Sequence, residues 1–390
     1  MYIHDLNCGW MDHPFARNRF MVDDFATLNK IHGTGVVEVD IDTDLGVDVG
    51  VVKTNVVDGE EIEESLADLI EFLPNIIVRL SPAEEFDHAK NLYANANKLM
   101  QDMMKDVRLG KPIALEQCEP MIDNIVESMF RFPSALLPLA QMKTVDEYTF
   151  QHPVSVAALA VAFGRVLDMP HDDIKDIALG GLLLDVGKAL VPGRILSKPG
   201  KLDGEEFYIM KSHVLHTAKL LNGINGVSEI TFNAATQHHE RYDGSGYPHG
   251  LKGDEISLHG QMIAIVDVYD AITSIRVYRK RMPPAEALGK LFKWSGTHFN
   301  NKLVQAFIKG IGIYPAGSLV LMESGRLGIV REVVPDKLLQ PIVQLIYDCK
   351  KMCHITPEIV NLSDTNDKIK SHESFEKWGI DQAKWATAHV

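Results

Sequence analysis

The period of the hydrophobic positions changes twice along the 390 residues of the chain. In the first part, Val36–Asp42 alternates between apolar and polar residues as a half-buried strand does, and Gly46–Val52 is similar. Asp24–Lys30 has helical spacing. We therefore predict a small mixed α+β unit, which precedes the break at Ser81-Pro82.

After this break the apolar residues recur at helical spacing for most of the chain. The pattern predicts helices at Ala83–Arg108, Leu115–Phe130 and Ser134–Met142, and nearly continuous helical structure from Thr144 to about Gly312. Short strands follow, predicted at Gly317–Met322, Gly328–Val334 and Ile342–Tyr347. The last segment, Ser371–His389, is predicted to be a polar amphipathic helix or a loose tail.

These patterns predict a mainly α protein of four parts. They are a small α+β N-terminal module at 1–80, a helical linker or bundle at 83–143, an all-helical domain at 144–314, and a short β extension with a C-terminal tail at 315–390.

Composition narrows the class of protein. The hydrophobic share of 46% is that of a soluble globular chain, and the formal charge of −14 argues against a broad nucleic-acid or anionic-membrane surface. The four cysteines form no disulfide framework, and the chain has neither a signal-peptide pattern at Met1–Asp5 nor an apolar run long enough to span a membrane. We expect a cytoplasmic protein that binds no DNA, RNA or membrane but could still bind a small anion.

A pair of histidines, His238 and His239, stands directly before a turn-rich segment that contains Gly244, Gly246 and Pro248. Turn chemistry accounts for the glycines and the proline, but it does not account for two adjacent imidazoles. Two readings stay open on these residues alone, namely a pair of surface histidines or ligands of a metal cluster.

Two carboxylates stand in apolar surroundings, Asp185 after Leu182–Leu184 and Asp267 within Met262–Val268. Each could cap a helix or pair with an arginine. Because a buried carboxylate is costly without a partner, two of them in a chain with histidines at helix ends favour a metal cluster. His152, at the predicted start of a helix with Pro153 in its first turn, and His213 complete the set. A mixed histidine and aspartate shell suits iron, manganese, nickel or zinc better than calcium.

Fixed cations accompany the cluster. Lys188 lies three residues beyond Asp185 on the same helix face, and Arg276 and Arg279 lie three residues apart beyond Asp267. Each could be a residue of a solvated surface. Beside a metal cluster, however, such cations are typical of phosphoryl chemistry, in which they hold the charge of the phosphate oxygens.

Three stretches of the chain resemble the HD-GYP phosphodiesterases of bacterial cyclic di-GMP signalling. They are Asp185–His213 with its Ile195-Leu196-Ser197-Lys198-Pro199-Gly200-Lys201-Leu202 segment, His238–Pro248 with its Gly-Tyr-Pro, and Asp267–Ser274. The front, with Trp10 and His13-Pro14-Phe15, resembles the small module that often precedes these domains, and the tail from Pro315 resembles their β extension.

The resemblance implies an all-helical HD-type domain that hydrolyses cyclic di-GMP to linear pGpG, and in some members on to GMP. It implies a di- or trinuclear metal site, often of iron or manganese. For this chain we expect one or two divalent transition metals, with iron or manganese favoured over nickel or zinc. The metal ligands would be His152, Asp185, His213, His238, His239 and Asp267, with Asp185 as a bridging, catalytic ligand. Lys188 would face the scissile phosphate, Arg276 and Arg279 would hold substrate phosphates, and Gly246 and Tyr247 would shape the substrate loop.

The chain departs from the family pattern at Leu184, which stands where the family has the histidine of its His-Asp signature. Tyr148 stands where trinuclear members carry a metal-binding glutamate. Two hypotheses follow: a phosphodiesterase weakened by the lost ligand, or a receptor for cyclic di-GMP or a protein-interaction module that keeps the pocket without turnover. Diguanylate cyclase-type signalling proteins are candidate partners, and the sequence leaves open whether the chain forms a homodimer.

Overall fold

A computed structural model of the chain describes residues 2–5, 20–22, 40–41, 82–141, 148–198, 200–274, 282–334, 337–381 and 385. The chain divides into two compact units, Met1–Val78 and Arg79–Val390. Within the described residues, no helix combines the length and the apolar character needed to cross a membrane. The division into four parts expected from the sequence remains a prediction.

In the first unit, three short strands form an antiparallel sheet in the order β2-β1-β3. They are β1 (Tyr2–Asp5), β2 (Phe20–Met21) and β3 (Asp40–Ile41). β3 lies within the strand predicted at Val36–Asp42. The predicted strand Gly46–Val52 and the predicted helix Asp24–Lys30 lie outside the described residues.

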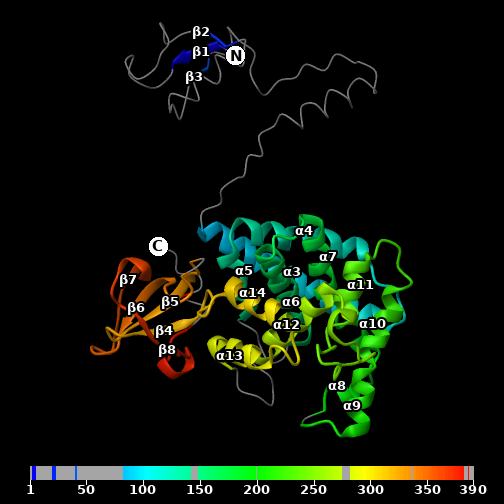
Figure 1. The fold of residues 1–390 in the computed structure, drawn as a ribbon. Helices are drawn as coiled ribbons and strands as arrows, with labels where there is room; N and C mark the ends of the chain where they lie inside the picture. The colour runs from blue at the N-terminus through cyan, green and yellow to red at the C-terminus, as the bar shows by residue number, and fades with distance from the viewer. Residues whose placement is uncertain are drawn as a thin grey trace. The chain divides into compact units, whose positions relative to one another are not determined.

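The second unit is largely helical, as predicted (Figure 1). Its first three helices end within a residue or two of the predicted positions. They are α3 (Pro82–Arg108), α4 (Leu115–Arg131) and α5 (Pro133–Gln141). The remaining α-helices are α6 (Tyr148–Val166), α7 (His171–Leu183), α8 (Gly193–Leu196), α9 (Gly204–Lys211), α10 (His213–Leu221), α11 (Glu229–Thr236), α12 (Leu258–Thr273), α13 (Pro284–Trp294) and α14 (Asn301–Ile311). Two 3-10 helices, Val186–Leu190 and Gly253–Glu255, join them.

Helix α6 is the centre of the helical unit because it is apolar on all sides. Val154 and Ala158 belong to a hydrophobic cluster with α3, α4 and α5, whereas Val156 and Phe163 belong to a second cluster with α12, α13 and α14. A helix with such a pattern is stable only when it is buried on every face. Its position in the middle of the unit fixes His152 deep in the protein.

The start of α6 differs from the sequence-based expectation. The helix already includes Tyr148, so Pro153 lies inside it rather than in its first turn. A proline at this place leaves the carbonyl group of Thr149 without its usual helical donor. Packing on all sides of α6 compensates for that loss, which a local rule for proline does not take into account.

The C-terminal part of the second unit is an antiparallel sheet in the order β7-β6-β5-β4-β8. Its strands are β4 (Leu319–Met322), β5 (Arg326–Glu332), β6 (Ile342–Asp348), β7 (Cys353–Asn361) and β8 (Ile369–Glu373), with 3-10 turns at Leu362–Asp364 and Glu376–Trp378. Neighbouring residues such as Leu319 and Val320 belong to different hydrophobic clusters, so both faces of the sheet are covered.

One expectation for the C-terminal part was wrong, and one strand was not predicted. Ser371–His389 was predicted to be a helix or a loose tail, but Ser371 to Glu373 complete β8, which pairs with β4. The sequence pattern also missed β7. This edge strand is mostly exposed and contains Pro357, so it has no alternation that would predict a strand.

Candidate metal centre

The six predicted ligands come from five separate elements and meet in the helical unit. His152 lies on α6, Asp185 directly follows α7, and His213 begins α10. His238 and His239 follow α11, and Asp267 lies on α12. Five of the six are buried and His239 is half-buried. Among the described residues, Asp185 makes no side-chain cap, and the ion-pair partners of Asp185 and Asp267 are histidines and Lys188.

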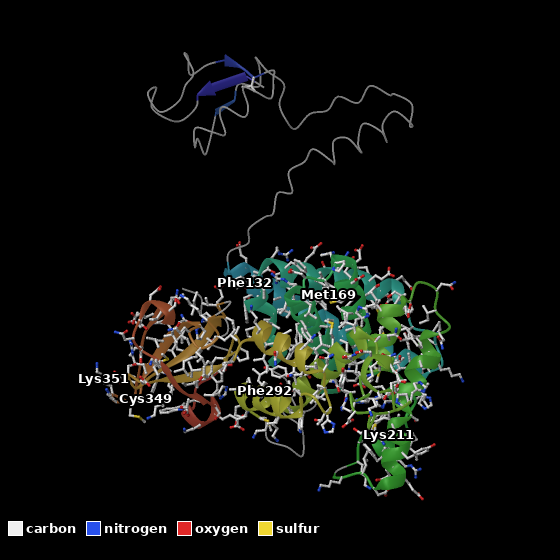
Figure 2. The ribbon with its side chains drawn as sticks, in the orientation of Figure 1. Phe132, Met169, Lys211, Phe292, Cys349 and Lys351 are labelled. Carbon is white, nitrogen blue, oxygen red and sulfur yellow. The ribbon has the colours of Figure 1, made fainter. Side chains whose placement is uncertain are left out.

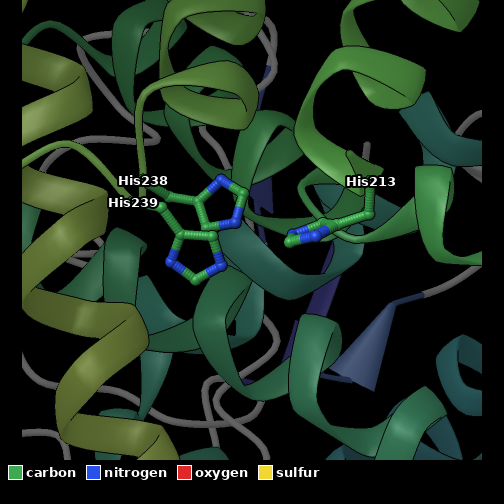
Figure 3. Close-up of side chains that lie close together, drawn as sticks. All are labelled: His213, His238 and His239. Atoms are coloured by element: carbon green, nitrogen blue, oxygen red, sulfur yellow. The ribbon is translucent and has the colours of Figure 1, made fainter. Parts of the chain in front are cut away.

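Three histidines form the core of the site. One ring nitrogen of each of His213, His238 and His239 lies within 4.8 Å of the others, and Figure 3 shows the rings turned toward one another. Nδ1 of His213 lies 2.7 Å from the carbonyl oxygen of Met210, and Nδ1 of His238 lies 2.8 Å from that of Ala235. A proton on each Nδ1 donates to the carbonyl group, which leaves each Nε2 lone pair for a cation.

Asp185 connects this trio to the second half of the site. Its Oδ1 lies 3.4 Å from Nε2 of His213, and its Oδ2 lies 3.8 Å from Nε2 of His152. Nζ of Lys188 lies 2.5 Å from the same Oδ2. The two oxygens therefore face different groups of ligands, which is the geometry of a carboxylate that can bridge two positions.

The second half of the site consists of His152, Asp267 and Asp270. Nε2 of His152 lies 3.0 Å from Oδ1 of Asp267, and its Nδ1 lies 2.6 Å from Oδ2 of Asp270. Oδ2 of Asp267 lies 3.8 Å from Nδ1 of His239, which joins the two halves. Asp270 was not among the predicted residues. It lies three residues beyond Asp267, a spacing that places both on one face of α12.

Charge and burial favour the protonation states that a metal site needs. Burial, together with the charge of Lys188, lowers the pKa of His213 to about 4, and burial also lowers the pKa values of His238 and His239. Burial opposes ionisation of Asp185, but the charges of Lys188 and the histidines outweigh it and hold its pKa below the ordinary value. Neutral imidazoles and an ionised carboxylate are the forms that bind cations.

His152 behaves differently from the trio. Burial alone would lower its pKa, but its hydrogen bonds with Asp267 and Asp270 dominate and raise it. The same interaction, against the effect of burial, lowers the pKa of Asp267. In this half of the site, the positive charge of a protonated His152 is thus balanced by Asp267 and Asp270. In the histidine trio, Nε2 of His213 and Nε2 of His238 have no hydrogen-bond partner among the described residues.

The turn after Asp185 requires a glycine. A Cβ atom on Gly187 would lie 2.0 Å from the carbonyl oxygen of His213, so no larger residue fits. The hydroxyl group of Thr217 donates to the carbonyl oxygen of Leu184 and accepts from the backbone N–H of Gly187. The close approach of this turn to α10 positions Asp185 and Lys188 against His213. Sequence reasoning missed Thr217, which carries no motif signal of its own.

The loop after the histidine pair is ordered by Glu240, another residue that the sequence reasoning missed as a functional candidate. This buried carboxylate accepts hydrogen bonds from the backbone N–H groups of His249 and Leu251. A Cβ atom on Gly246 would lie within 2.6 Å of backbone atoms of Glu240 and Arg241. The loop therefore places the ring of Tyr247 4.6 Å from that of His239, centroid to centroid.

Leu184 is fully buried and belongs to the apolar cluster that includes Val156, Phe163 and Met262. It offers no ligand atom to the site. Arg276 and Arg279 lie outside the described residues, so the structure does not place them, and the side chain of Tyr148 is likewise not described.

Buried polar atoms without hydrogen-bond partners indicate that these residues fit a divalent metal. Three buried polar atoms of the site have no hydrogen-bond partner in the described part of the chain, namely Oδ1 of Asp185, Nε2 of His213 and Nε2 of His238. Buried polar atoms without partners are costly, and all three belong to the same cluster. A cation bound there would satisfy them, and its ligands would be nitrogen and carboxylate atoms that suit first-row transition metals.

A helical unit with a buried centre of histidines and aspartates is the arrangement of an HD domain. The chain matches the HD domain family over residues 122–303 and a family described as a domain of unknown function, DUF3391, over residues 1–118. It is 38% identical over 389 residues to the cyclic di-GMP phosphodiesterase PA4108 of Pseudomonas aeruginosa, and the match covers 97% of this chain and 91% of that protein. The chain belongs to the HD-GYP family of HD-domain proteins.

Two other relatives match a smaller part of the chain. A cyclic di-GMP phosphodiesterase of Thermotoga maritima is 37% identical over 165 residues, which are 42% of this chain and 45% of that protein. The 3'3'-cGAMP-specific phosphodiesterase 2 of Vibrio cholerae is 35% identical over 162 residues, 41% of this chain and 31% of that protein. The chain thus spans less than half the length of both.

Among solved structures, Bd1817, an HDG"Y"P protein from Bdellovibrio bacteriovorus, is similar with a TM-score of 0.50. The two chains are 17% identical, and the match covers 64% of this chain and 79% of the other. At this identity the likeness supports the fold alone.

Proposed function

We propose that the protein is a metal-dependent phosphodiesterase that hydrolyses cyclic di-GMP to pGpG. The observation that carries the proposal is the convergence of four histidines and two aspartates, with the two oxygens of Asp185 facing different halves of the site. The names of the relatives in Pseudomonas aeruginosa and Thermotoga maritima support the substrate. GMP as the final product remains open.

The proposed metal ligands form two groups that share Asp185. One group is the histidine trio, and the other is His152 with Asp267. A divalent cation in such a site supplies Lewis acidity, which stabilises the charge of a phosphoryl group in the transition state. Asp270 holds the ring of His152 through Nδ1, so Nε2 is directed at the site.

The remaining residues bind and orient the substrate. The ammonium group of Lys188, which lies beside Asp185, is placed to neutralise charge on the scissile phosphate. Tyr247 stays protonated because burial and the charges of Asp267 and Asp185 raise its pKa, so it can donate a hydrogen bond. Gly246 permits the loop that carries it. Arg276 and Arg279 are proposed to hold substrate phosphates, on the basis of their positions in the family pattern.

A second candidate function rests on Leu184. Because this apolar residue replaces a family ligand and is fully buried, the site could retain cyclic di-GMP without hydrolysing it. The protein would then act as a receptor or a protein-interaction module. Against this reading, the chain retains the other six ligand residues of the two-metal pattern, and apart from Leu184 only the glutamate of trinuclear members is replaced, by Tyr148.

The test is a turnover assay on the full chain loaded with Mn²⁺ or Fe²⁺. Cyclic di-GMP and 3'3'-cGAMP are offered separately, and the products are separated by chromatography. Formation of pGpG supports the proposal, whereas binding of cyclic di-GMP without any product supports the receptor reading. Preferred hydrolysis of 3'3'-cGAMP would assign the chain to the second substrate class.

Metal content tests the site itself. The purified chain is expected to hold at least one transition metal ion, and His238→Ala combined with His239→Ala is expected to remove it. His249→Ala, which changes an exposed histidine of the same segment, is the matched control. A folded wild-type protein that binds no Mn²⁺, Fe²⁺, Ni²⁺ or Zn²⁺ would contradict the catalytic proposal.

A further inference from the structure

Lys211 is held at the rim of the histidine trio by two aromatic rings. Its Nζ lies 4.8 Å from the ring centroid of Phe207 and 4.9 Å from that of Tyr247. The ring of Tyr247 in turn lies 4.6 Å from that of His239. The ammonium group is therefore one aromatic ring away from a predicted metal ligand. Figure 2 labels Lys211 beside α9, where α8 and α9 extend from the helical unit.

Local backbone geometry fixes this position. Lys211 is the last residue of α9 and lies two residues before His213. The backbone N–H and the hydroxyl group of Ser212 both donate to the carbonyl oxygen of Ile209, and the carbonyl group of Met210 holds Nδ1 of His213. One short turn thus directs His213 into the site and Lys211 along its edge.

The charge of Lys211 is not neutralised within the described part of the chain. Lys188 pairs with Asp185 and Lys198 pairs with Glu206, but no described carboxylate pairs with Lys211. Aromatic faces attract an ammonium group only weakly at a partly exposed position. They orient the charge without cancelling it. Lys211 and Tyr247 are both half-buried, so solvent and a ligand can reach them.

We propose that Lys211 binds the second, non-reacting phosphodiester of the cyclic dinucleotide. This inference rests on the proposed function, because such a substrate carries two phosphodiesters and only one can lie at the metal ligands. The other needs cations farther out. Lys211 would add to Arg276 and Arg279, which are already proposed to hold substrate phosphates, because an ammonium group is a good point-charge partner for a phosphate. Lys211 would then contribute to the choice of cyclic dinucleotides over simple phosphodiesters.

The experiment compares two substrates in the metal-loaded full chain. Cyclic di-GMP has two phosphodiesters, and bis(4-nitrophenyl) phosphate has only one. For Lys211→Met we expect the KM for cyclic di-GMP to rise about tenfold, the equivalent of about 1.4 kcal/mol, with kcat within twofold. Hydrolysis of bis(4-nitrophenyl) phosphate should not change. Lys211→Arg should restore most of the affinity, and Lys219→Met, an exposed lysine on α10, is the matched control.

Binding of cyclic di-GMP to the metal-free chain, measured by calorimetry, tests the inference even without turnover. There, Lys211→Met should raise the Kd about tenfold as well. An unchanged Kd and KM would overturn the role of Lys211 and leave the phosphodiesterase proposal intact. An equal loss for both phosphodiester substrates would also overturn it, because Lys211 would then act through the metal site. A wild-type chain that binds no cyclic di-GMP would contradict the proposed function and this inference together.

Discussion

Nδ1 of His152 lies 2.6 Å from Oδ2 of Asp270, a contact between α6 and α12 in which both side chains are buried. A metal-ligating histidine commonly donates its second ring N–H to a carboxylate, which fixes the tautomer and the orientation of the ring. The structure thus adds to the predicted set a residue that acts on the site through a ligand.

Replacement of Asp270 by asparagine should therefore weaken the second half of the site. We expect a loss of about 10–100-fold in metal affinity or in kcat, because the ring of His152 is no longer held by an anion. Metal titration and steady-state kinetics check this. Asp254→Asn, at an exposed aspartate of the same part of the chain, should behave like wild type. Wild-type metal affinity and kcat in Asp270→Asn would show that the contact has no functional role.

Leu184→His should restore the ligand that the family pattern has at this position. In the presence of Mn²⁺ we expect a higher kcat and an additional bound ion. Without metal, the free energy of unfolding should fall by about 1–3 kcal/mol, because an imidazole would replace a leucine in a fully apolar cluster.

The control for this prediction is Leu184→Ala, which removes the same apolar contacts without adding a nitrogen. It should destabilise the protein by about 2–5 kcal/mol with or without metal. Chemical denaturation with and without Mn²⁺ and a count of bound ions separate the two variants. An unchanged ion count in Leu184→His would mean that the side chain at this position does not reach the site.

The proposed metal ligands in the helical unit were predictable from the sequence, because a buried carboxylate or imidazole in an apolar run is costly unless a partner or a cation stabilises it. Asp185 and Asp267 stood out on this ground, and the structure brings both to the histidine trio. Asp270 and Thr217 did not stand out, since a single polar residue within a helix is ordinary. Their roles depend on contacts with His152 and with Leu184 that only the tertiary packing creates.

The β extension shows a similar division. β4, β5 and β6 were predicted as short strands separated by turn residues, and their apolar runs supply both covered faces of the sheet. β7 and β8 were missed or misassigned because edge strands bury little and therefore leave a weak pattern. Their assignment depends on pairing with β6 and β4, which is a long-range property.

Gly246→Ala should disrupt the loop that carries Tyr247. The added methyl group would lie within 2.6 Å of the backbone of Glu240 and Arg241, and backbone atoms cannot move aside as a flexible side chain can. We expect the loop to shift, so that kcat/KM for cyclic di-GMP falls at least tenfold while the metal content stays the same. Gly193→Ala is the matched control, because nothing lies within 4 Å of its new methyl group. Equal kinetics for the two variants would contradict a role for the close approach at Gly246.

The metal-free protein should lose stability as the pH falls from 6.5 to about 4. The pKa of His213 is lowered from 6.5 to about 4, chiefly by burial, so in this range the unfolded chain binds a proton that the folded chain does not. His238 and His239 act in the same direction. His152, whose pKa is raised, contributes stability that is fully present below 6.5, so it does not oppose the loss. For His213 alone the loss should be on the order of 3 kcal/mol.

Denaturation in a chelating buffer at several pH values measures this loss. His213→Gln should make the loss smaller, because one of the three histidines that titrate differently in the folded and unfolded chain is gone. A divalent cation should oppose the loss, since it binds the neutral form of the histidines and competes with protons for them. The destabilisation below pH 6.5 should therefore be smaller in Mn²⁺ than in the chelator. A metal-free wild-type chain with constant stability between pH 6.5 and 4 would mean that the histidine trio is open to water, which is incompatible with a desolvated metal centre.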